Sequence, residues 1–220
     1  ERVAAGHHGS FGVHGFHGAD PKTGQAFNVF DTAHGGWGGS VHGDGVGPYK
    51  TITHADTKDI PVETLEALYP VMLERYSWRT DSAGAGRHRG GLGLDRIFRI
   101  VAPCNLNMSF ERSKCPPWGI LGGLPGQHGW GEIEHPDGRL ERVQKVSSRP
   151  LKPGQRIRIH SAGGGGCGAP IERDPEAVRL DVLRGYVSAQ IAEDVYGVVI
   201  TADHRIDAAA TARRRSAMTK

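Results

Sequence analysis

The sequence predicts a β-rich α+β fold with glycine-rich loops and with short helices mainly in its C-terminal quarter. Alternating apolar residues mark short strands in the middle of the chain, and many of the 33 glycines cluster between those strands. Helix start and stop signals gather after residue 170. A chain of 220 residues can form one sizeable domain or two small ones. We expect a Gly/His-rich segment over 1–60, a strand-rich core over 61–165 and a helical segment over 166–220.

Glycine and histidine dominate the first segment. Glycines recur at every third position from Gly6 to Gly18, and a second glycine cluster covers 35–47. The first run is short and contains no proline, which excludes a collagen helix. It favours either a glycine-rich strand pair or a loop packed closely under another chain. Residues 21–24 predict a turn, and residues 25–31 predict a strand.

The middle segment predicts one short helix and several strands. The helix begins near Pro61 and ends at Pro70, since proline suits a first turn and cannot continue a helix. Its expected buried stripe consists of Leu65, Leu68 and Tyr69. Apolar alternation predicts strands over 71–78, 95–101, 106–110 and 155–160, and a hairpin over 129–146 that turns at Pro136-Asp137-Gly138.

The last segment carries clear capping signals. Asp174 followed by Pro175 predicts the start of a helix, and Gly185 predicts its end. Ser188 can cap a second helix that runs to about residue 196. A short strand over 198–201 and a terminal helix from 206 complete the expected elements.

Residues 79–93, which read RTDSAGAGRHRGGLG, hold five glycines and three arginines between two predicted strands. One interpretation is a tight structural loop whose arginines form ion pairs within the chain. The other is a loop that contacts an anion or a partner subunit through Arg79, Arg87 or Arg89. Only Asp81 and Asp95 lie nearby in sequence, so we expect one of the last two arginines to face outward, with Arg89 as the partner anchor.

Two other patterns suggest sites. His14, His17 and Asp20 have side chains that bind zinc or manganese, but neighbours on a glycine-rich loop do not form a prepared site, and solvated or backbone-bonded histidines are the favoured interpretation. The run 163–168 contains GxGxxG, but the next convincing helix begins only near Pro175. We therefore expect a tight chain crossing there and not a nucleotide site.

Composition excludes several classes of protein. The net charge is only +3 and the basic residues are dispersed, which argues against a nucleic-acid-binding protein. Three cysteines without a CxxC motif are typical of reduced thiols in a cytoplasmic protein. No apolar run approaches the roughly 20 residues of a membrane helix, so no membrane contact is expected.

Four ordered stretches resemble the hydantoinase B/oxoprolinase family. The loop 79–93 is similar to its DSGGAGxxRGGLG signature, and Glu111-Arg112 with 116–126 is similar to ER…PPxGxxGGxPG. Residues 161–175 resemble PGGGGYGDPxxRDP, although Cys167 and Ala169 stand where Tyr and Asp are usual. Residues 181–199 resemble the closing DVxxGxVS…A…YGVV. The resemblance is to the C-terminal part of the family's large subunit.

This resemblance implies a subunit or fragment of an ATP-dependent amidohydrolase that opens a cyclic imide or lactam, such as hydantoin, N-methylhydantoin or 5-oxoproline, through a phosphorylated carbonyl. It implies a hetero-oligomer in which a hydantoinase A-like ATPase subunit holds ATP and Mg, and the N-terminal part of the hydantoinase B-like protein holds zinc or manganese. The candidate interface or anion-contacting residues are Asp44, Arg79, Asp81, Arg87, Arg89, Glu111 and Arg112.

Two alternatives stay open beside the amidohydrolase. One is a subunit of an ATP-dependent acetone/acetophenone-type carboxylase, and the other is a non-catalytic assembly module. Within the resemblance, acetone carboxylases typically lack an acid at the position of Asp81, so Asp81 favours the hydrolase or the acetophenone branch.

Overall fold

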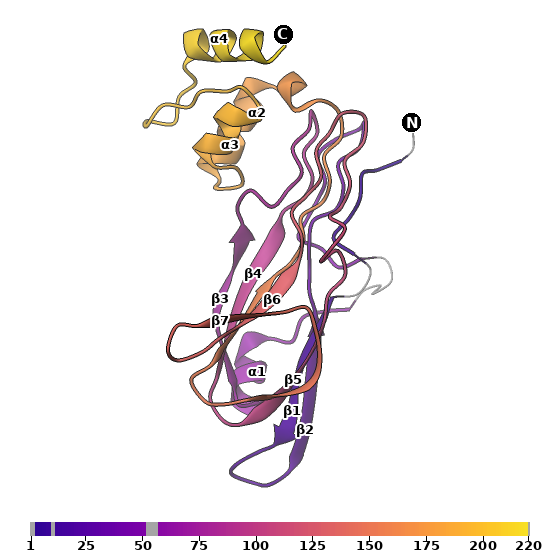
Figure 1. Cartoon of the computed structure of the whole chain (residues 1–220), viewed down its shortest axis with the longest axis vertical. Coiled ribbons are helices and arrows are strands. Elements are labelled where there is room, and N and C mark those ends of the chain that lie inside the picture. The colour runs from indigo at the N-terminus through magenta and orange to yellow at the C-terminus, as the bar shows by residue number, and fades with distance from the viewer. Residues whose placement is uncertain (1–2, 10–11, 52–56, 220) are drawn as a thin grey trace.

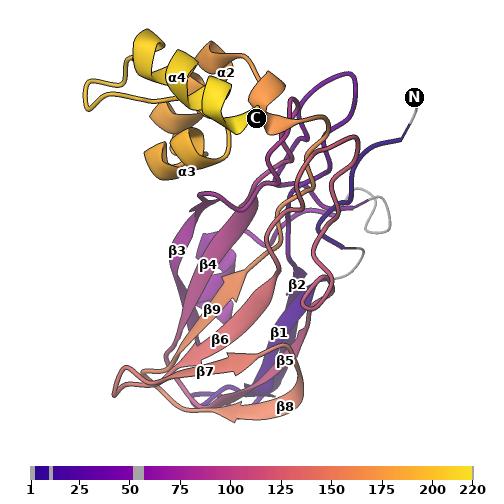
Figure 2. The same ribbon diagram turned by 45° about the horizontal axis from the view of Figure 1, so that its top comes forward.

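Two antiparallel β-sheets form one end of the molecule and a group of helices forms the other (Figure 1). This is a computed structural model, and it describes residues 3–9, 12–51 and 57–219. A bundle of extended segments lies between the two ends, and a second view shows the same arrangement (Figure 2). The predicted fold class is confirmed, because the helices of the described chain lie mostly after residue 170.

Each sheet combines strands that are distant in sequence. The order β2-β1-β5-β8 builds the first sheet, and the order β3-β4-β9-β6-β7 builds the second. The first contains β1 (Val13–Ala19), β2 (Ala26–Thr32), β5 (Cys104–Ser109) and β8 (Lys145–Leu151). The second contains β3 (Val71–Arg79), β4 (Gly93–Ile100), β6 (Trp130–Glu134), β7 (Leu140–Val143) and β9 (Arg156–His160).

The main hydrophobic core fills the space between the sheets. Burial alternates along β4, β5 and β9, as the apolar alternation in the sequence predicts. Leu106 from the first sheet and Ile157 from the second are fully buried, and α1 (Val62–Leu68) adds Leu65 to the same cluster. The predicted hairpin is also confirmed, since β6 and β7 pair around the 136–138 turn.

Two expectations about elements are wrong, and one strand was not predicted. Strand β8 has no counterpart in the prediction, because KVSSRPL lacks apolar alternation and this edge strand is mostly exposed. Leu68 is 61% exposed and does not belong to the buried stripe of α1. Residues 198–201 form no strand; only an isolated bridge joins Ile200 to Ile206.

Five extended segments meet between the sheets and the helices, and we call them the glycine array: 5–9, 35–47, 82–91, 117–126 and 161–168. The last segment runs through the middle and bonds to all the others through backbone atoms. Gly164 N donates to Gly91 O, Gly165 N to Gly6 O, Gly166 N to Leu124 O, and Gly165 O accepts from Gly39 N, over 2.8–2.9 Å. The array therefore satisfies its buried peptide groups as a sheet does, but in several directions around one chain.

The array has no room for side chains at its centre. A Cβ atom on Gly163, Gly164, Gly165 or Gly166 would lie 1.9–2.1 Å from a carbonyl oxygen of a neighbouring segment. Gly163 and Gly166 face the same segment, 82–91, whereas the two glycines between them face other segments. This period of three matches an extended chain with three residues per turn, as in polyproline II. Only glycine permits such close approach of backbones.

The helices form a second, smaller core, and we call α2 (Pro175–Leu183), α3 (Ala189–Asp194) and α4 (Ala208–Met218) the helical unit. A 3-10 helix over Pro170–Glu172 leads into it. The predicted caps are confirmed, since Asp174 accepts a hydrogen bond from Glu176 N and Ser188 accepts one from Ile191 N. Its core residues are Val178, Val187, Ala192, Tyr196 and Val198, packed with Ala85 of the glycine array. None of the helices in the described ranges has the length and apolar character needed to cross a bilayer.

The glycine array yields a direct prediction. Gly164→Ala should lower the free energy of unfolding by about 3 kcal/mol or more, because its Cβ would overlap the Trp37 carbonyl at 2.0 Å. Gly43→Ala is the matched control, since no atom lies within 4 Å of its added Cβ, and it should change stability by less than about 1 kcal/mol. Urea unfolding followed by circular dichroism measures both values. Equal stabilities for the two variants would contradict the packing described here.

Candidate functional site

The loop 79–93 runs from β3 through the glycine array to β4, and its first arginine is a buried structural residue. Arg79 Nη1 donates to His128 O at 2.6 Å and to Ser161 O at 2.9 Å. The guanidinium also lies 4.2 Å from the centre of the Trp130 ring. Burial lowers the pKa of Arg79 to about 10. The Arg79 guanidinium thus joins β3 to the segments that contain His128 and Ser161. Because it is buried in these contacts, it is not available to bind an external anion.

Asp81 joins the same loop to the helical unit. Its backbone has φ 61°, in the left-handed region that asparagine and aspartate tolerate better than most residues. One carboxylate oxygen accepts from Ser188 N at 2.7 Å, and the Asp81 N–H donates to Tyr186 O at 3.1 Å. Asp81 therefore fixes the start of α3 against the loop.

Four charged residues form a cluster between the glycine array and the helical unit, and we call it the Arg–Asp cluster: Asp44, Arg89, Arg173 and Asp181. Arg173 binds Asp44 through two parallel hydrogen bonds of 2.7 Å and binds Asp181 at 2.9 Å. Arg89 Nε donates to Asp181 at 3.1 Å, and the Arg89 N–H donates to Asp44 at 2.9 Å. Two arginines and two carboxylates leave the cluster neutral.

Burial makes these charges interdependent. The side chains of Arg173 and Asp181 are only 6% and 4% exposed. Burial raises the pKa of Asp44, but the hydrogen bonds and the charge of Arg173 outweigh it and hold that pKa below its usual value. A buried arginine or carboxylate without its partner would be strongly unfavourable, so the cluster stabilises the docking of the helical unit only as a complete set.

Arg89 does not face outward as expected, because its side chain pairs with Asp181 within the chain and is only 11% exposed. Its partner Asp181 lies 92 residues away in sequence, a distance over which sequence reasoning offers no pairing signal. Arg87 is the exposed arginine of the loop instead. It borders an open hollow of about 460 Å³ together with Asp44, His88, Glu172, Arg173, Asp174 and Ala177.

Glu111 and Arg112 lie elsewhere, at the edge of the glycine array. Arg112 has φ 53°, and its guanidinium lies 4.8 Å from the centre of the Trp118 ring. Glu111 is exposed and lies against Gly9. Neither residue joins the Arg–Asp cluster. The predicted candidates therefore do not form one site. They lie in separate places: Arg79 is buried, Asp81 joins the loop to α3, and Asp44 and Arg89 belong to the Arg–Asp cluster.

His14, His17 and Asp20 do not meet. They lie in or just after β1, where successive side chains point to opposite faces, so a spacing of three separates His14 from His17. His17 contacts Asn107 at 3.2 Å, and Asp20 accepts from Lys22 N at 2.7 Å in the following turn. Among the described residues, no three His, Cys, Asp or Glu side chains gather in a way that could hold a metal ion.

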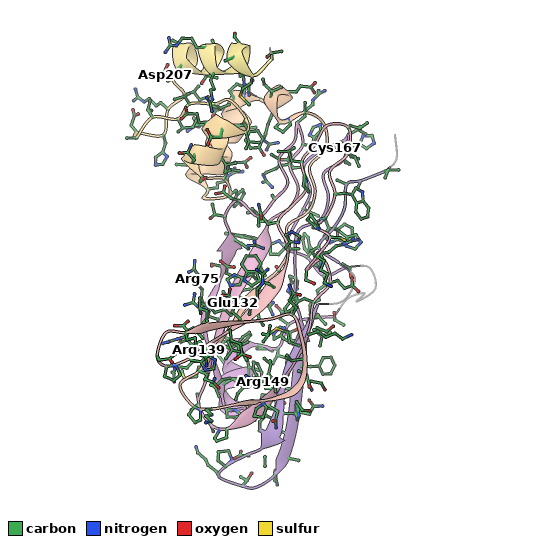
Figure 3. The ribbon with its side chains drawn as sticks, in the orientation of Figure 1. Arg75, Glu132, Arg139, Arg149, Cys167 and Asp207 are labelled. Carbon is green, nitrogen blue, oxygen red and sulfur yellow. The ribbon has the colours of Figure 1, made fainter. Side chains whose placement is uncertain are left out.

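The run 163–168 crosses the interior of the glycine array, as the tight-crossing interpretation predicts. Its amides donate to carbonyl groups of neighbouring segments, so they do not form a phosphate cradle. Cys167 is 1% exposed and lies where the extended segments approach the helical unit (Figure 3). A nucleotide would need open space beside these amides, and backbone atoms of the other segments fill that space.

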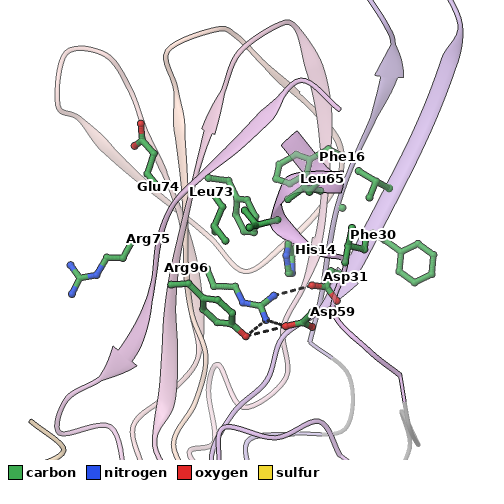
Figure 4. A pocket seen from close by; sticks show the side chains of 16 residues that line it. His14, Phe16, Phe30, Asp31, Asp59, Leu65, Leu73, Glu74, Arg75 and Arg96 are labelled. Atoms are coloured by element: carbon green, nitrogen blue, oxygen red, sulfur yellow. Dashed lines mark hydrogen bonds and ion pairs between the residues drawn. The ribbon is translucent and has the colours of Figure 1, made fainter. Parts of the chain in front are cut away.

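A cavity opens between the two sheets, and no motif in the sequence points to it. It has a volume of about 430 Å³, and most of its wall is apolar (Figure 4). His14, which is 2% exposed, lines it as well. Burial lowers the pKa of His14 to about 3, so its imidazole is neutral near pH 7. The apolar lining includes Phe16, Val29, Val62, Leu65, Leu73 and Phe98.

A charged network closes one end of the cavity. Arg96, whose side chain is 4% exposed, donates to Asp31 at 3.0 Å, to Asp59 at 2.8 Å and to Tyr76 Oη at 2.7 Å. Lys50 Nζ lies 3.2 Å from Asp59. One feature of the sequence could have predicted this charged network. Arg96 alternates with Leu94, Phe98 and Ile100 on the buried face of β4, and a charged residue on that face needs buried partners.

The Arg–Asp cluster yields a paired prediction. Arg173→Ala should lower the free energy of unfolding by about 3–5 kcal/mol, because it leaves Asp44 and the buried Asp181 with Arg89 as the one remaining cation of the cluster. Arg179→Ala removes an exposed pair with Glu176 on α2 and should cost less than about 1 kcal/mol. Thermal unfolding of both variants measures the difference. Similar losses would show that the cluster contributes no more than a surface pair.

Known proteins match this chain over most of its length. The sequence model of the family described as Hydantoinase B/oxoprolinase matches residues 1–170. A putative D-/L-hydantoinase subunit of Pseudomonas sp. (strain NS671) is 32% identical over 179 residues, which is 80% of this chain and 30% of that protein. The chain thus spans less than half the length of this relative.

Two solved structures share the fold. The crystal structure of ATP-dependent caprolactamase from Pseudomonas jessenii superposes with a TM-score of 0.84 at 30% identity, and the match covers 98% of this chain and 38% of the caprolactamase chain. Nucleotide-free acetone carboxylase gives a TM-score of 0.83 at 21% identity, over 99% of this chain and 34% of the carboxylase chain. The resemblance drawn from the four sequence stretches is therefore confirmed: the chain belongs to the hydantoinase B/oxoprolinase family.

Proposed function

We propose that this chain is part of the large subunit of an ATP-dependent amidohydrolase that opens a cyclic imide or a lactam. The observation that carries the proposal is the likeness to the caprolactamase structure, which extends over 98% of this chain at 30% identity. The relative named as a hydantoinase subunit, 32% identical, supports the same class. Hydantoin, N-methylhydantoin, 5-oxoproline and lactams are the candidate substrates.

The proposed reaction uses ATP to activate a poor electrophile. A hydantoinase A-like partner, with ATP and Mg, transfers the terminal phosphoryl group to the carbonyl oxygen of the ring amide. The carbon of the O-phosphorylated amide has lost amide resonance, so water adds to it. The ring C–N bond then breaks as the nitrogen takes up a proton, and a second water hydrolyses the resulting acyl phosphate to a carboxylate and phosphate. Following the family resemblance, we place the divalent metal, zinc or manganese, in the N-terminal part of the hydantoinase B-like protein, outside these residues.

The role we assign to this chain is to shape the complex. Arg79, Asp81 and Arg89 bind groups of this chain, so they position the glycine array and the helical unit. Arg87 at the open hollow is the candidate contact to a partner or an anion. No nucleophile–base pair emerges from the predicted candidates, so we expect the chain alone to have no hydrolytic activity.

A carboxylase is the second candidate, since acetone carboxylase has the same fold. Asp81 is the residue expected to separate the two classes. Its carboxylate holds the start of α3, which is a structural use and does not discriminate between two reactions. The preference for the hydrolase therefore comes from the higher identity to the caprolactamase, 30% against 21%.

The test of this function is ATP turnover by the complete complex. With a hydantoinase A-like subunit and the full B-like subunit, we expect phosphate release that depends on a hydantoin, 5-oxoproline or a lactam, together with the ring-opened product. The present chain by itself should release no product above background. Phosphate release that requires bicarbonate and a ketone would instead make the protein a carboxylase, and the absence of turnover with every cyclic amide would overturn the proposal.

Arg87 yields a more specific prediction. Arg87→Ala should weaken association with the partner subunit by about tenfold while leaving the melting temperature of this chain unchanged, because an exposed arginine contributes to an interface more than to its own fold. Arg139→Ala is the matched control, since Arg139 is exposed at the β6–β7 turn, far from the helical unit (Figure 3). Surface plasmon resonance measures association, and calorimetry measures melting. Equal affinities for both variants would remove Arg87 from the interface.

A further inference from the structure

A turn in the glycine array holds a leucine in a conformation that suits glycine or asparagine. Gly123 N donates to Ile120 O at 2.9 Å, and the two residues between them, Leu121 and Gly122, have φ values of 52° and 86°. Positive φ at both central residues is characteristic of a type I′ turn, in which Asn, Asp and Gly predominate. This conformation is unfavourable for leucine, because its Cβ approaches the following carbonyl oxygen. Among the described residues with positive φ other than glycine, Leu121 is the only apolar one.

The fold itself gains little from this leucine. Leu121 is 69% exposed and belongs to neither hydrophobic core of the described chain. Trp118 and Leu124, which flank the same turn, are 51% and 42% exposed. Asparagine or glycine at position 121 would suit the turn better, and a strained residue that adds nothing to a core points to a role outside the fold. We therefore expect this exposed leucine to contact another surface.

The 120–123 turn lies next to the exposed Arg87. Gly168 joins the two, since its N–H donates to Ile120 O at 3.0 Å and its carbonyl oxygen accepts from Arg87 N at 3.1 Å. A Cβ atom placed on Gly168 would lie 3.0 Å from the Arg87 Cβ. The neighbouring Cys167 marks this region, where the array approaches the helical unit (Figure 3). Leu121 and Arg87 therefore belong to one continuous surface.

The charges of the hollow beside Arg87 favour a protein surface over a free anion. Three acids and two arginines line the hollow: Asp44, Glu172, Asp174, Arg87 and Arg173. Asp44 and Arg173 bind each other, which leaves two acids beside Arg87. A protonated His88, which also lines the hollow, would only balance this excess, so no net positive charge attracts phosphate or a free carboxylate. A protein can present a carboxylate to Arg87 and an apolar pocket to Leu121 at the same time.

We propose that the 120–123 turn docks into the hydantoinase A-like ATPase subunit, with Leu121 in an apolar pocket of that subunit and Arg87 beside one of its carboxylates. The inference rests on the proposed function, which supplies this partner, and it assigns Arg87 to a protein contact. A small apolar centre with charged side chains around it is typical of chains that associate as separate subunits, whereas interfaces between identical copies are more apolar.

Leu121→Asn separates docking from folding, because it should change the two in different ways. Asparagine followed by glycine is a preferred pair for a type I′ turn, so the melting temperature of the complete hydantoinase B-like subunit should stay the same or rise. The affinity of that subunit for the ATPase subunit should fall by about tenfold or more, since the interface loses its apolar anchor. Surface plasmon resonance without substrate measures the affinity, and calorimetry measures the melting temperature.

Leu68→Asn is the matched control. It makes the same chemical change at a leucine that is 61% exposed, close to the 69% of Leu121. Leu68 lies on α1, which sits among the sheets and away from the helical unit (Figure 1). Affinity for the ATPase subunit should not change in this variant.

Several outcomes would overturn the inference. Equal affinities of the Leu121→Asn and Leu68→Asn variants would remove Leu121 from the interface, and so would failure of the unmodified subunit to bind the ATPase subunit. A lower melting temperature of the Leu121→Asn variant would place Leu121 in a contact within the large subunit. Loss of self-association with unchanged affinity for the ATPase subunit would assign the turn to a second copy of this chain.

The docking and the proposed function can fail separately, because the affinity is measured without substrate. Binding that depends on Leu121, in a complex that turns over no cyclic amide, would refute the proposed reaction and leave the docking in place. Turnover of a cyclic amide with undiminished affinity in the Leu121→Asn variant would refute the docking alone.

Discussion

Close approach of backbones without side chains is the constraint on which this structure depends. Five segments of the chain enter one bundle, and the central one bonds to each of the others. A peptide group buried there would cost several kcal/mol if it lost its bonds to water, so each needs a partner from another segment. The segments reach those partners because residues 163–166 have no Cβ atom, which would overlap a carbonyl oxygen. This need for backbones to approach one another without side chains explains why glycines cluster in the sequence.

The glycine array determines where the charged residues lie. It carries Asp44 on one segment and Arg89 on another, and it ends beside Arg173, so the Arg–Asp cluster assembles where array and helical unit meet. The loop 79–93 serves the same purpose at Asp81, which holds the start of α3. A chain with sheets at one end and helices at the other is thus connected by hydrogen bonds and ion pairs more than by apolar packing (Figure 1).

Local patterns in the sequence predicted the elements that depend on a few neighbouring residues. Apolar alternation located β4, β5 and β9, and capping residues located α2 and α3. The same reasoning could not predict β8, whose exposed edge position leaves no apolar period. It also could not pair Arg89 with Asp181, and it left His14 on either a strand or a loop, without the cavity that this residue of β1 lines. These features arise from contacts between residues far apart in the chain.

Amide hydrogen exchange tests the central claim most directly, because it reads the hydrogen bonds of the glycine array one residue at a time. We expect the amides of Gly164, Gly165 and Gly166 to exchange as slowly as those of β4, since all three donate within the array. Exchange of these glycines at the rate of the exposed 136–138 turn, with β4 still protected, would show that the array is an ordinary loop and would contradict the claim.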